Sequence, residues 1–255
     1  MYNDLLTIGK FTIHGYGLMI AIGLIAAYAL GDWRAKKLGL DPDKLFNLVA
    51  WAVVLGLVGA KLLYYITILP EILENPKLLL NLADGFVVYG GIIGGVVTGY
   101  VYCRIKKMDF WKYFDLAMPC VALAQGFGRI GCFLAGCCYG METDGACAIV
   151  FENSQFAPNG VPLVPTQLIS SGLNFLNFFV LMFLSKRLKA DGQVSALYLI
   201  FYSIGRFILE FFRGDLIRGS VGSLSTSQFI SLFVCAAGVF LFVAASRRQK
   251  KEIAA

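Results

Sequence analysis

The sequence predicts an all-α, polytopic membrane protein with seven transmembrane helices. The chain has 255 residues, of which 58% are hydrophobic and 15% are charged, whereas about a quarter of the residues of a soluble domain are charged. The hydrophobic residues come in runs of about 20, the length that a helix needs to cross the hydrocarbon core of a bilayer. Charged residues, or stretches with glycine or proline, separate these runs.

The seven expected helices follow one another along the chain without a long soluble segment, a repeat or a low-complexity tract between them. Their ranges are 12–31, 45–68, 86–103, 114–136, 167–185, 194–212 and 226–245. We therefore expect a single transmembrane domain over residues 1–255. The third range is rich in glycine, which is typical of helices that approach one another closely.

The basic residues predict how these helices are oriented. The first, third and fifth loops and the C-terminal tail carry three or four Lys or Arg each, while the second loop has one and the fourth has none. Because cytoplasmic loops are enriched in Lys and Arg, we expect the N-terminus outside and the C-terminus in the cytoplasm. We read the net charge of +6 as this orientation signal and expect no nucleic-acid partner. In a bacterial cell, the outside would be the periplasm or the cell surface.

Arg129 is the first candidate functional residue, because it lies inside the fourth expected helix between Gly128 and Ile130. A charged side chain at the centre of a bilayer costs about 2.5–3.5 kcal/mol by insertion scales. Such a residue is tolerated where it faces the protein interior or a wet cavity and binds an anion. We therefore predict an anion site around Arg129.

Arg206, Glu210 and Arg213 form a second group, spaced four and three residues apart on one helix face. One interpretation is an ion ladder that neutralises itself and only lowers the cost of burial. The other is an anion site in which Glu210 positions the arginines, with Arg129 opposite. Guanidinium groups bind phosphate in a bidentate manner, and a phospholipid is the phosphate-bearing substrate most available there.

Five further residues are weaker candidates. Lys61 is another intramembrane cation, which either binds the lipid or snorkels to the surface. His14 is the only histidine, and it is either an interfacial residue or a base that takes a proton near pH 7. Tyr89 would point a hydroxyl into the site, and Gly90 and Gly91 would let a lipid head group or tail approach the backbone.

The seven cysteines divide into two groups. Three lie singly in or beside apolar runs and are expected to be core thiols: Cys103, Cys120 and Cys235. The other four cluster on the outer side: Cys132, Cys137, Cys138 and Cys147. Four interpretations stay open for this cluster: a zinc site, which the spacing C-x4-C-C fits poorly; a disulfide from Cys147 to Cys137 or Cys138; a catalytic thiol activated by Arg129; and inert packing. We expect no metal and no cofactor.

Taken together, these residues resemble the prolipoprotein diacylglyceryl transferase family over nearly the whole chain, as a divergent member. That family consists of bacterial enzymes with seven spans and an external N-terminus, so the resemblance implies a location in the bacterial inner (plasma) membrane. The matching segments begin at Tyr16, Gly59, Tyr89, Gly128, Pro165 and Arg206, and read YGLM, GAK, YGG, GRIGCFLAGCCYG, PTQL and RFILEFFR. The fourth segment lies at the family signature, and the last matches the sixth-span motif closely.

The resemblance implies transfer of the diacylglyceryl group of phosphatidylglycerol to the thiol of a lipobox cysteine in a prolipoprotein, with release of glycerol 1-phosphate. By this resemblance, Arg129 and Arg206 would hold the phosphate and stabilise its departure electrostatically. Glu210 would orient Arg206, while Tyr16 and Gly140 would shape the lipid site.

The chain departs from the family pattern where protons are handled. Cys132 and Cys137 replace the signature Asn and Glu in the substrate site, Ala135 replaces a second Asn, and Tyr89 and Val164 replace histidines. His14 and Tyr89 are then the candidates for the missing base. Two alternatives follow: a paralogue that uses the same phospholipid with a different outer-side acceptor, and a membrane protein that binds or transports lipid without chemistry.

Overall fold

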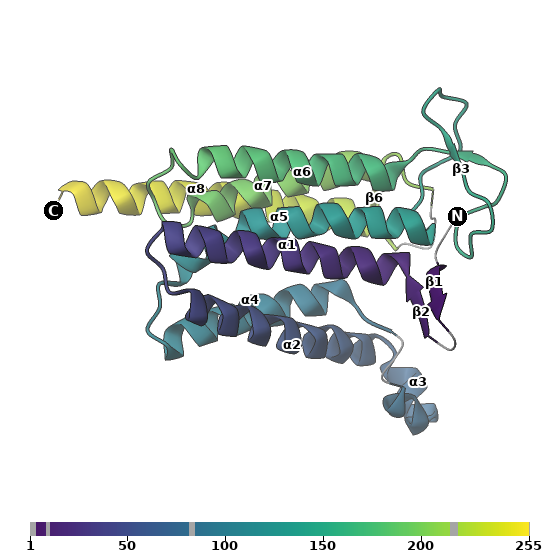
Figure 1. Ribbon diagram of the computed structural model, residues 1–255, viewed down its shortest axis with the longest axis horizontal. Helices are drawn as coiled ribbons and strands as arrows, with labels where there is room; N and C mark the ends of the chain where they lie inside the picture. The colour runs from purple at the N-terminus through teal and green to yellow at the C-terminus, as the bar shows by residue number, and fades with distance from the viewer. Residues whose placement is uncertain (1–3, 9–10, 82–84, 215–218, 255) are drawn as a thin grey trace. The chain divides into compact units, whose positions relative to one another are not determined.

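The computed structural model describes residues 4–8, 11–81, 85–214 and 219–254. The fold is mostly helical (Figure 1). Helices occur within a few residues of every expected range: α1 Gly15–Lys37, α2 Pro42–Thr67, α4 Val88–Ile105, α5 Phe110–Ala135, α6 Thr166–Leu184, α7 Gln193–Glu210 and α8 Thr226–Ala254. The short helix α3 (Leu69–Glu74) and the 3-10 helix η1 (Pro76–Leu80) follow α2.

Six of these helices are long and apolar enough to cross a membrane, counted over the described residues: α1, α2, α4, α5, α6 and α8. Helix α7 has 18 residues but is not among the six, because Gln193, Arg206 and Glu210 lower its mean hydropathy. The chain is therefore a polytopic helical membrane protein. The seventh span and the orientation of the termini stay predictions.

The described residues form three short antiparallel strand pairs, which the sequence did not predict. They are β1 (Asp4–Ile8) with β2 (Phe11–His14), β3 (Ile149–Val150) with β4 (Pro162–Leu163), and β5 (Ser220–Val221) with β6 (Leu224–Ser225). The first pair precedes α1 and includes residues 12–14, which were expected to begin the first helix. The strands β3 to β6 have two residues each, too few to show a period-two pattern in a sequence.

The chain divides into two compact units, one of Met1–Gly31 with Phe114–Ala255 and the other of Asp32–Tyr113. In the second unit, α2 and α4 lie side by side (Figure 1). A Cβ atom on Gly59 would lie 2.5 Å from the carbonyl oxygen of Gly90, and one on Gly94 would lie 2.8 Å from that of Leu55. These glycines therefore allow the two helices to touch through their backbones.

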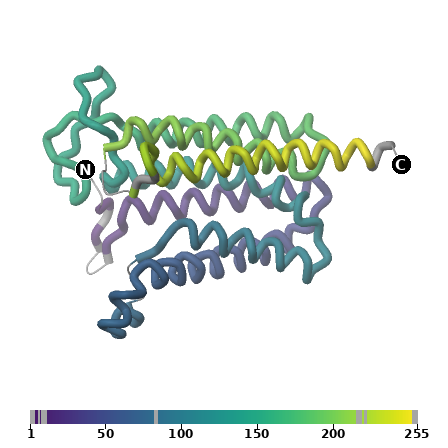
Figure 2. The backbone as a smooth tube through the Cα atoms, turned by 180° about the vertical axis from the view of Figure 1, so that it is seen from behind, coloured from purple at the N-terminus to yellow at the C-terminus, as the bar shows by residue number. Residues whose placement is uncertain are grey.

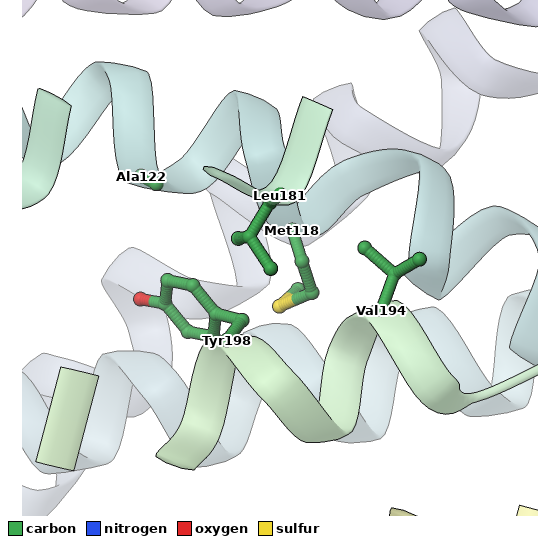
Figure 3. Packing of buried hydrophobic residues seen from close by; sticks show 5 residues of the cluster. All are labelled: Met118, Ala122, Leu181, Val194 and Tyr198. Atoms are coloured by element: carbon green, nitrogen blue, oxygen red, sulfur yellow. The ribbon is translucent and has the colours of Figure 1, made fainter. Parts of the chain in front are cut away.

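In the first unit, α8 runs alongside α7 and extends beyond it (Figure 2). Helices α5, α6 and α7 share a buried hydrophobic cluster (Figure 3): Met118, Ala122, Leu181, Val194 and Tyr198. This packing holds together the three helices that carry the candidate functional residues.

Asp115 of α5 caps the start of α7. The residue before α7 is Gly192, which has no side chain to cap the helix. The Asp115 carboxylate instead accepts hydrogen bonds from the backbone N–H groups of Gly192 (2.7 Å) and Ser195 (2.8 Å), and from the Ser195 hydroxyl (2.5 Å). A carboxylate at a helix N-terminus satisfies free N–H groups and complements the helix dipole, so Asp115 fixes α7 against α5.

We expect Asp115→Ala to lower the free energy of unfolding by about 1–3 kcal/mol, because three buried donors lose a charged acceptor. Thermal unfolding of the purified protein in detergent measures this effect. Asp144→Ala is the control, since Asp144 is exposed in the loop between α5 and α6. Equal unfolding midpoints for the two variants would contradict the capping role.

Candidate functional site

Helices α5, α6 and α7 of the first unit line a pocket with about 330 Å³ of empty space, counting the part open to the surroundings. Arg129 of α5 and Arg206 of α7 both line it. Its remaining lining residues are Ser170, Leu173, Asn174, Asn177, Phe201, Tyr202, Gly205 and Leu209. The two arginines that the sequence singled out thus meet at one pocket.

The Arg206 side chain is held in place from two helices. Its Nη1 atom lies 2.6 Å from Oε2 of Glu210, one turn further along α7. Its Nη2 atom donates a hydrogen bond of 2.8 Å to the Ser227 hydroxyl of α8. Both members of the ion pair are largely buried, with 15% and 7% of their side chains exposed. A guanidinium fixed in this way loses little conformational entropy when it binds an anion.

Charges of both signs act on Arg206. It experiences the negative charge of Glu210 and the positive charges of Arg129 and Arg213. Among the described residues, Glu210 thus lies between Arg206 and Arg213 along the chain and is placed to position them, as the anion-site interpretation requires.

Helix α6 contributes polar groups that the sequence reasoning missed. Ser170, Asn174 and Asn177 line the pocket, and Asn174 donates a hydrogen bond of 2.7 Å to the Ser170 carbonyl. The amide oxygen and nitrogen of Asn177 are buried and have no hydrogen-bond partner among the described residues. Because an unsatisfied buried amide is costly, Asn177 is suited to bind a polar ligand. The spacing i, i+4, i+7 in an apolar helix was the signal for this face.

The end of α5 forms a C-cap that brings two cysteines together. Gly136 has φ +72°, and its N–H donates to the Phe133 carbonyl while the Cys137 N–H donates to the Cys132 carbonyl, both at 3.1 Å. These are the two hydrogen bonds of the Schellman motif, in which the side chains at the positions of Cys132 and Cys137 contact each other.

Three cysteine sulfurs consequently cluster after α5. The sulfur atoms of Cys132, Cys137 and Cys138 lie within 4.8 Å of one another, and Arg213 lies beside Cys138. Hydrogen bonds from Cys132 and Cys137, together with Arg213, lower the pKa of the Cys138 thiol, while a hydrogen bond with Cys132 raises the pKa of Cys137. Cys147 is exposed, and all seven cysteines are free thiols. The structure thus contradicts the disulfide interpretation.

Gly140 joins the loop after α5 to the end of α7. Its N–H donates to the Val164 carbonyl at 3.1 Å, and it forms an antiparallel bridge with Arg213. The neighbouring Met141 N–H donates to the Phe212 carbonyl at 2.9 Å. A Cβ atom on Gly140 would overlap Val164 and would lie 2.9 Å from the Phe212 oxygen. Only glycine fits at this junction.

Tyr16 packs against α5, whereas His14 is exposed at the end of β2. The Tyr16 ring packs on α5, where a Cβ atom on Gly131 would lie 3.2 Å from it, and Tyr16 experiences the charge of Arg129. His14 is exposed at the end of β2, and its Nδ1 atom lies 2.7 Å from Oδ1 of Asp4. His14 is not among the lining residues of the pocket, and its role as a base stays a prediction.

The remaining candidates belong to the second unit. The Lys61 amine donates to the Asn81 carbonyl at 2.7 Å and lies about 5 Å from the rings of Tyr64 and Tyr65. Lys61 is buried, and both interpretations of its role stay predictions. In the same unit Tyr89 is exposed and Gly90 is packed against Gly59.

The helical fold and the arginine-lined pocket define a polytopic membrane protein with a cationic site between its helices. The model of the prolipoprotein diacylglyceryl transferase family matches residues 3–244, so the chain belongs to this family.

Three relatives carry the name phosphatidylglycerol–prolipoprotein diacylglyceryl transferase. The protein of Clostridium tetani is 51% identical over 230 residues, covering 90% of this chain and 92% of the relative. Transferase 2 of Clostridium perfringens is 45% identical over 242 residues, covering 94% of each. The protein of Finegoldia magna is 34% identical over 240 residues, covering 93% and 92%.

Proposed function

We propose that this protein transfers the diacylglyceryl group of phosphatidylglycerol to the cysteine thiol of a prolipoprotein, with release of glycerol 1-phosphate. Membership of the family and the names of the relatives support this proposal. The observation that carries it is that Arg129 and Arg206 line one pocket.

In the proposed mechanism, the two guanidinium groups bind the phosphate of the lipid. The bond between the glyceryl carbon and the phosphate oxygen breaks as the acceptor sulfur attacks that carbon, so negative charge grows on the departing phosphate. Groups fixed before the reaction stabilise this charge more than they stabilise the substrate. Glu210 and Ser227 fix Arg206, and Asn177 supplies an amide to the head group. Tyr16, Gly140, Cys132 and Cys137 are the proposed neighbours of the lipid.

We further propose that the whole chain forms one domain with seven spans, in which α7 is the sixth along the chain. The basic loops support an N-terminus outside and a C-terminus in the cytoplasm of a bacterial cell. Arg129 and Arg206 lie near the C-terminal ends of α5 and α7, which this topology assigns to the outer half of the inner membrane. Lys61, Tyr89 and Gly91 stay proposed neighbours of the substrate, whereas Gly90 is packed against Gly59 and serves the contact between α2 and α4. His14 and Tyr89 stay candidate bases.

A transfer assay tests the function directly. Purified protein is incubated with labelled phosphatidylglycerol and a lipobox peptide, and we expect release of glycerol phosphate together with a lipidated peptide. Binding of the phospholipid without release would contradict the enzyme and favour a lipid-binding protein. Complementation of a strain depleted of its lipoprotein transferase tests the acceptor. Failure of well-inserted protein to rescue would favour a different outer-side acceptor.

We expect Glu210→Gln to lower the rate of transfer about tenfold, because a hydrogen bond to a charged group contributes about 1.5–3 kcal/mol. The amide keeps the shape of Glu210 but removes the charge that orients Arg206. The assay above measures the rate. Glu142→Gln is the control, since Glu142 is exposed in the loop after α5. A Glu210→Gln enzyme as fast as its control would mean that Glu210 only offsets the cost of burying Arg206.

A further inference from the structure

The cluster of Cys132, Cys137 and Cys138 has no chemical role in the mechanism above. Its three sulfur atoms lie within 4.8 Å of one another, and sulfurs bound to a single zinc ion lie about 3.8 Å apart. Small side-chain rotations would therefore bring all three to one cation. The spacing C-x4-C-C counted against a metal in the sequence, but the C-cap at Gly136 removes that objection by folding Cys137 back onto Cys132.

The surrounding contacts hold this arrangement in place. The Thr166 hydroxyl donates to the Cys138 carbonyl at 3.0 Å, and the Gln167 amide donates to the Cys137 carbonyl at 2.9 Å. Both bonds come from the first turn of α6. All three cysteines are only partly exposed. Ligands on a backbone fixed in this way favour metal binding, because they lose little conformational entropy when the cation binds.

The charge balance fits a divalent cation with thiolate ligands. Three thiolates carry three negative charges, and a divalent cation neutralises two of them. Arg213 contributes a positive charge beside the remaining negative charge. Soft sulfur ligands select cations such as zinc over magnesium or calcium. Three protein ligands leave the fourth position of a tetrahedral site open, as in catalytic zinc sites.

The cluster also adjoins the phosphate pocket. Arg129 lines the pocket, and its charge acts on Cys132. Tyr16 experiences the charge of Arg129 and of all three cysteines. A thiol bound at the cluster would therefore lie next to the lipid whose phosphate Arg129 binds.

We propose that Cys132, Cys137 and Cys138 bind one zinc-like cation, whose fourth position takes the acceptor cysteine as a thiolate. This inference rests on the proposed transferase function. On binding the cation, the acceptor thiol releases its proton to water. Its sulfur then forms the C–S bond with the glyceryl carbon, the C–O bond to phosphate breaks, and glycerol 1-phosphate leaves. Because a cation deprotonates the thiol that it binds, neither His14 nor Tyr89 then has to act as the base.

Cadmium binding tests the site. Full-length protein in detergent, reduced and freed of metal, is titrated with Cd²⁺ while the sulfur-to-cadmium charge-transfer band is recorded in the ultraviolet. We expect the band to saturate at one cation per chain. It should disappear in Cys137→Ser and Cys138→Ser and persist in Cys147→Ser and Cys235→Ser. No saturable band, or an unchanged band in Cys137→Ser, would overturn the proposal.

Protection from alkylation repeats this test in the unmodified chain, where folding of a variant is not a concern. Mass spectrometry should show that Cd²⁺ shields Cys132, Cys137 and Cys138 from an alkylating reagent while Cys147 reacts as before. Equal labelling of all four cysteines with and without Cd²⁺ would contradict the site.

The open position is tested with Co²⁺ as the probe. Adding a lipobox peptide to Co²⁺-loaded protein should shift the visible absorption bands, whereas the same peptide with serine in place of its cysteine should not. An unchanged spectrum would overturn the role of the acceptor. Metal-free protein that transfers at the full rate would contradict this inference and leave the transferase function standing. Protein that transfers in neither state would count against that function itself.

Discussion

Arg129→Ala is expected to lower the rate of diacylglyceryl transfer at least about 100-fold, the usual effect of removing one fixed donor to a developing anion. The guanidinium lines the pocket and is half-buried, so in the alanine variant water does not fully replace it in stabilising the phosphate. Arg129→Lys should recover only part of the rate, because an ammonium cannot form the paired contact to phosphate. The assay with labelled phosphatidylglycerol and a lipobox peptide measures both variants.

Replacement of Arg129 tests the phosphate site with less effect on folding than replacement of Arg206. Arg206→Ala would leave Glu210 buried without its partner, and such a change costs about 3–5 kcal/mol of stability. A loss of activity in Arg206→Ala would therefore mix unfolding with chemistry. Arg187→Ala is the matched control for Arg129→Ala, because Arg187 is exposed and contacts the ring of Phe183 instead. A fully active and folded Arg129→Ala variant would refute the proposed role of Arg129.

Gly140→Ala is expected to abolish transfer and to lower the unfolding temperature. The added Cβ atom would overlap Val164 and approach the Phe212 carbonyl to 2.9 Å. It would break the backbone hydrogen bonds that join the loop after α5 to the end of α7. Overpacking of this kind costs about 1–3 kcal/mol or more, and here the displaced segments adjoin the cysteine cluster and Arg213.

Gly172→Ala is the matched control, because a Cβ atom at Gly172 would meet no heavy atom within 4 Å among the described residues outside its own stretch of α6. Alanine is favoured over glycine within a helix by about 1 kcal/mol, so we expect this variant to be at least as stable as the natural chain. Thermal unfolding and the transfer assay, run side by side, compare the two. Similar results for Gly140→Ala and Gly172→Ala would show that the junction tolerates expansion.

The helices could be predicted because the bilayer imposes a length and a composition on each of them. Every expected range overlaps a helix, although α1 ends at Lys37 instead of residue 31 and α8 ends at Ala254 instead of residue 245. Helix α7 is the exception in composition, since Arg206 and Glu210 lower its hydropathy while they build the pocket. The same two residues could be paired from the sequence, because a spacing of four is local on a helix.

Features that depend on tertiary contacts could not be predicted in this way. The capping of α7 by Asp115 joins residues that are 77 and 80 positions apart, and no local pattern announces it. The contact between Cys132 and Cys137 follows from the C-cap at Gly136. The spacing of the cysteines alone does not predict this contact. The spacing of Ser170, Asn174 and Asn177 marks a polar face on α6, but the helices that this face meets follow only from the tertiary packing.

The most direct test of the account is an experimental structure of the protein in a nanodisc that contains phosphatidylglycerol. We predict density for the lipid phosphate within hydrogen-bonding distance of both Arg129 and Arg206, with Glu210 still paired to Arg206. A lipid phosphate that binds away from both arginines, outside the pocket between α5, α6 and α7, would contradict the proposed phosphate site.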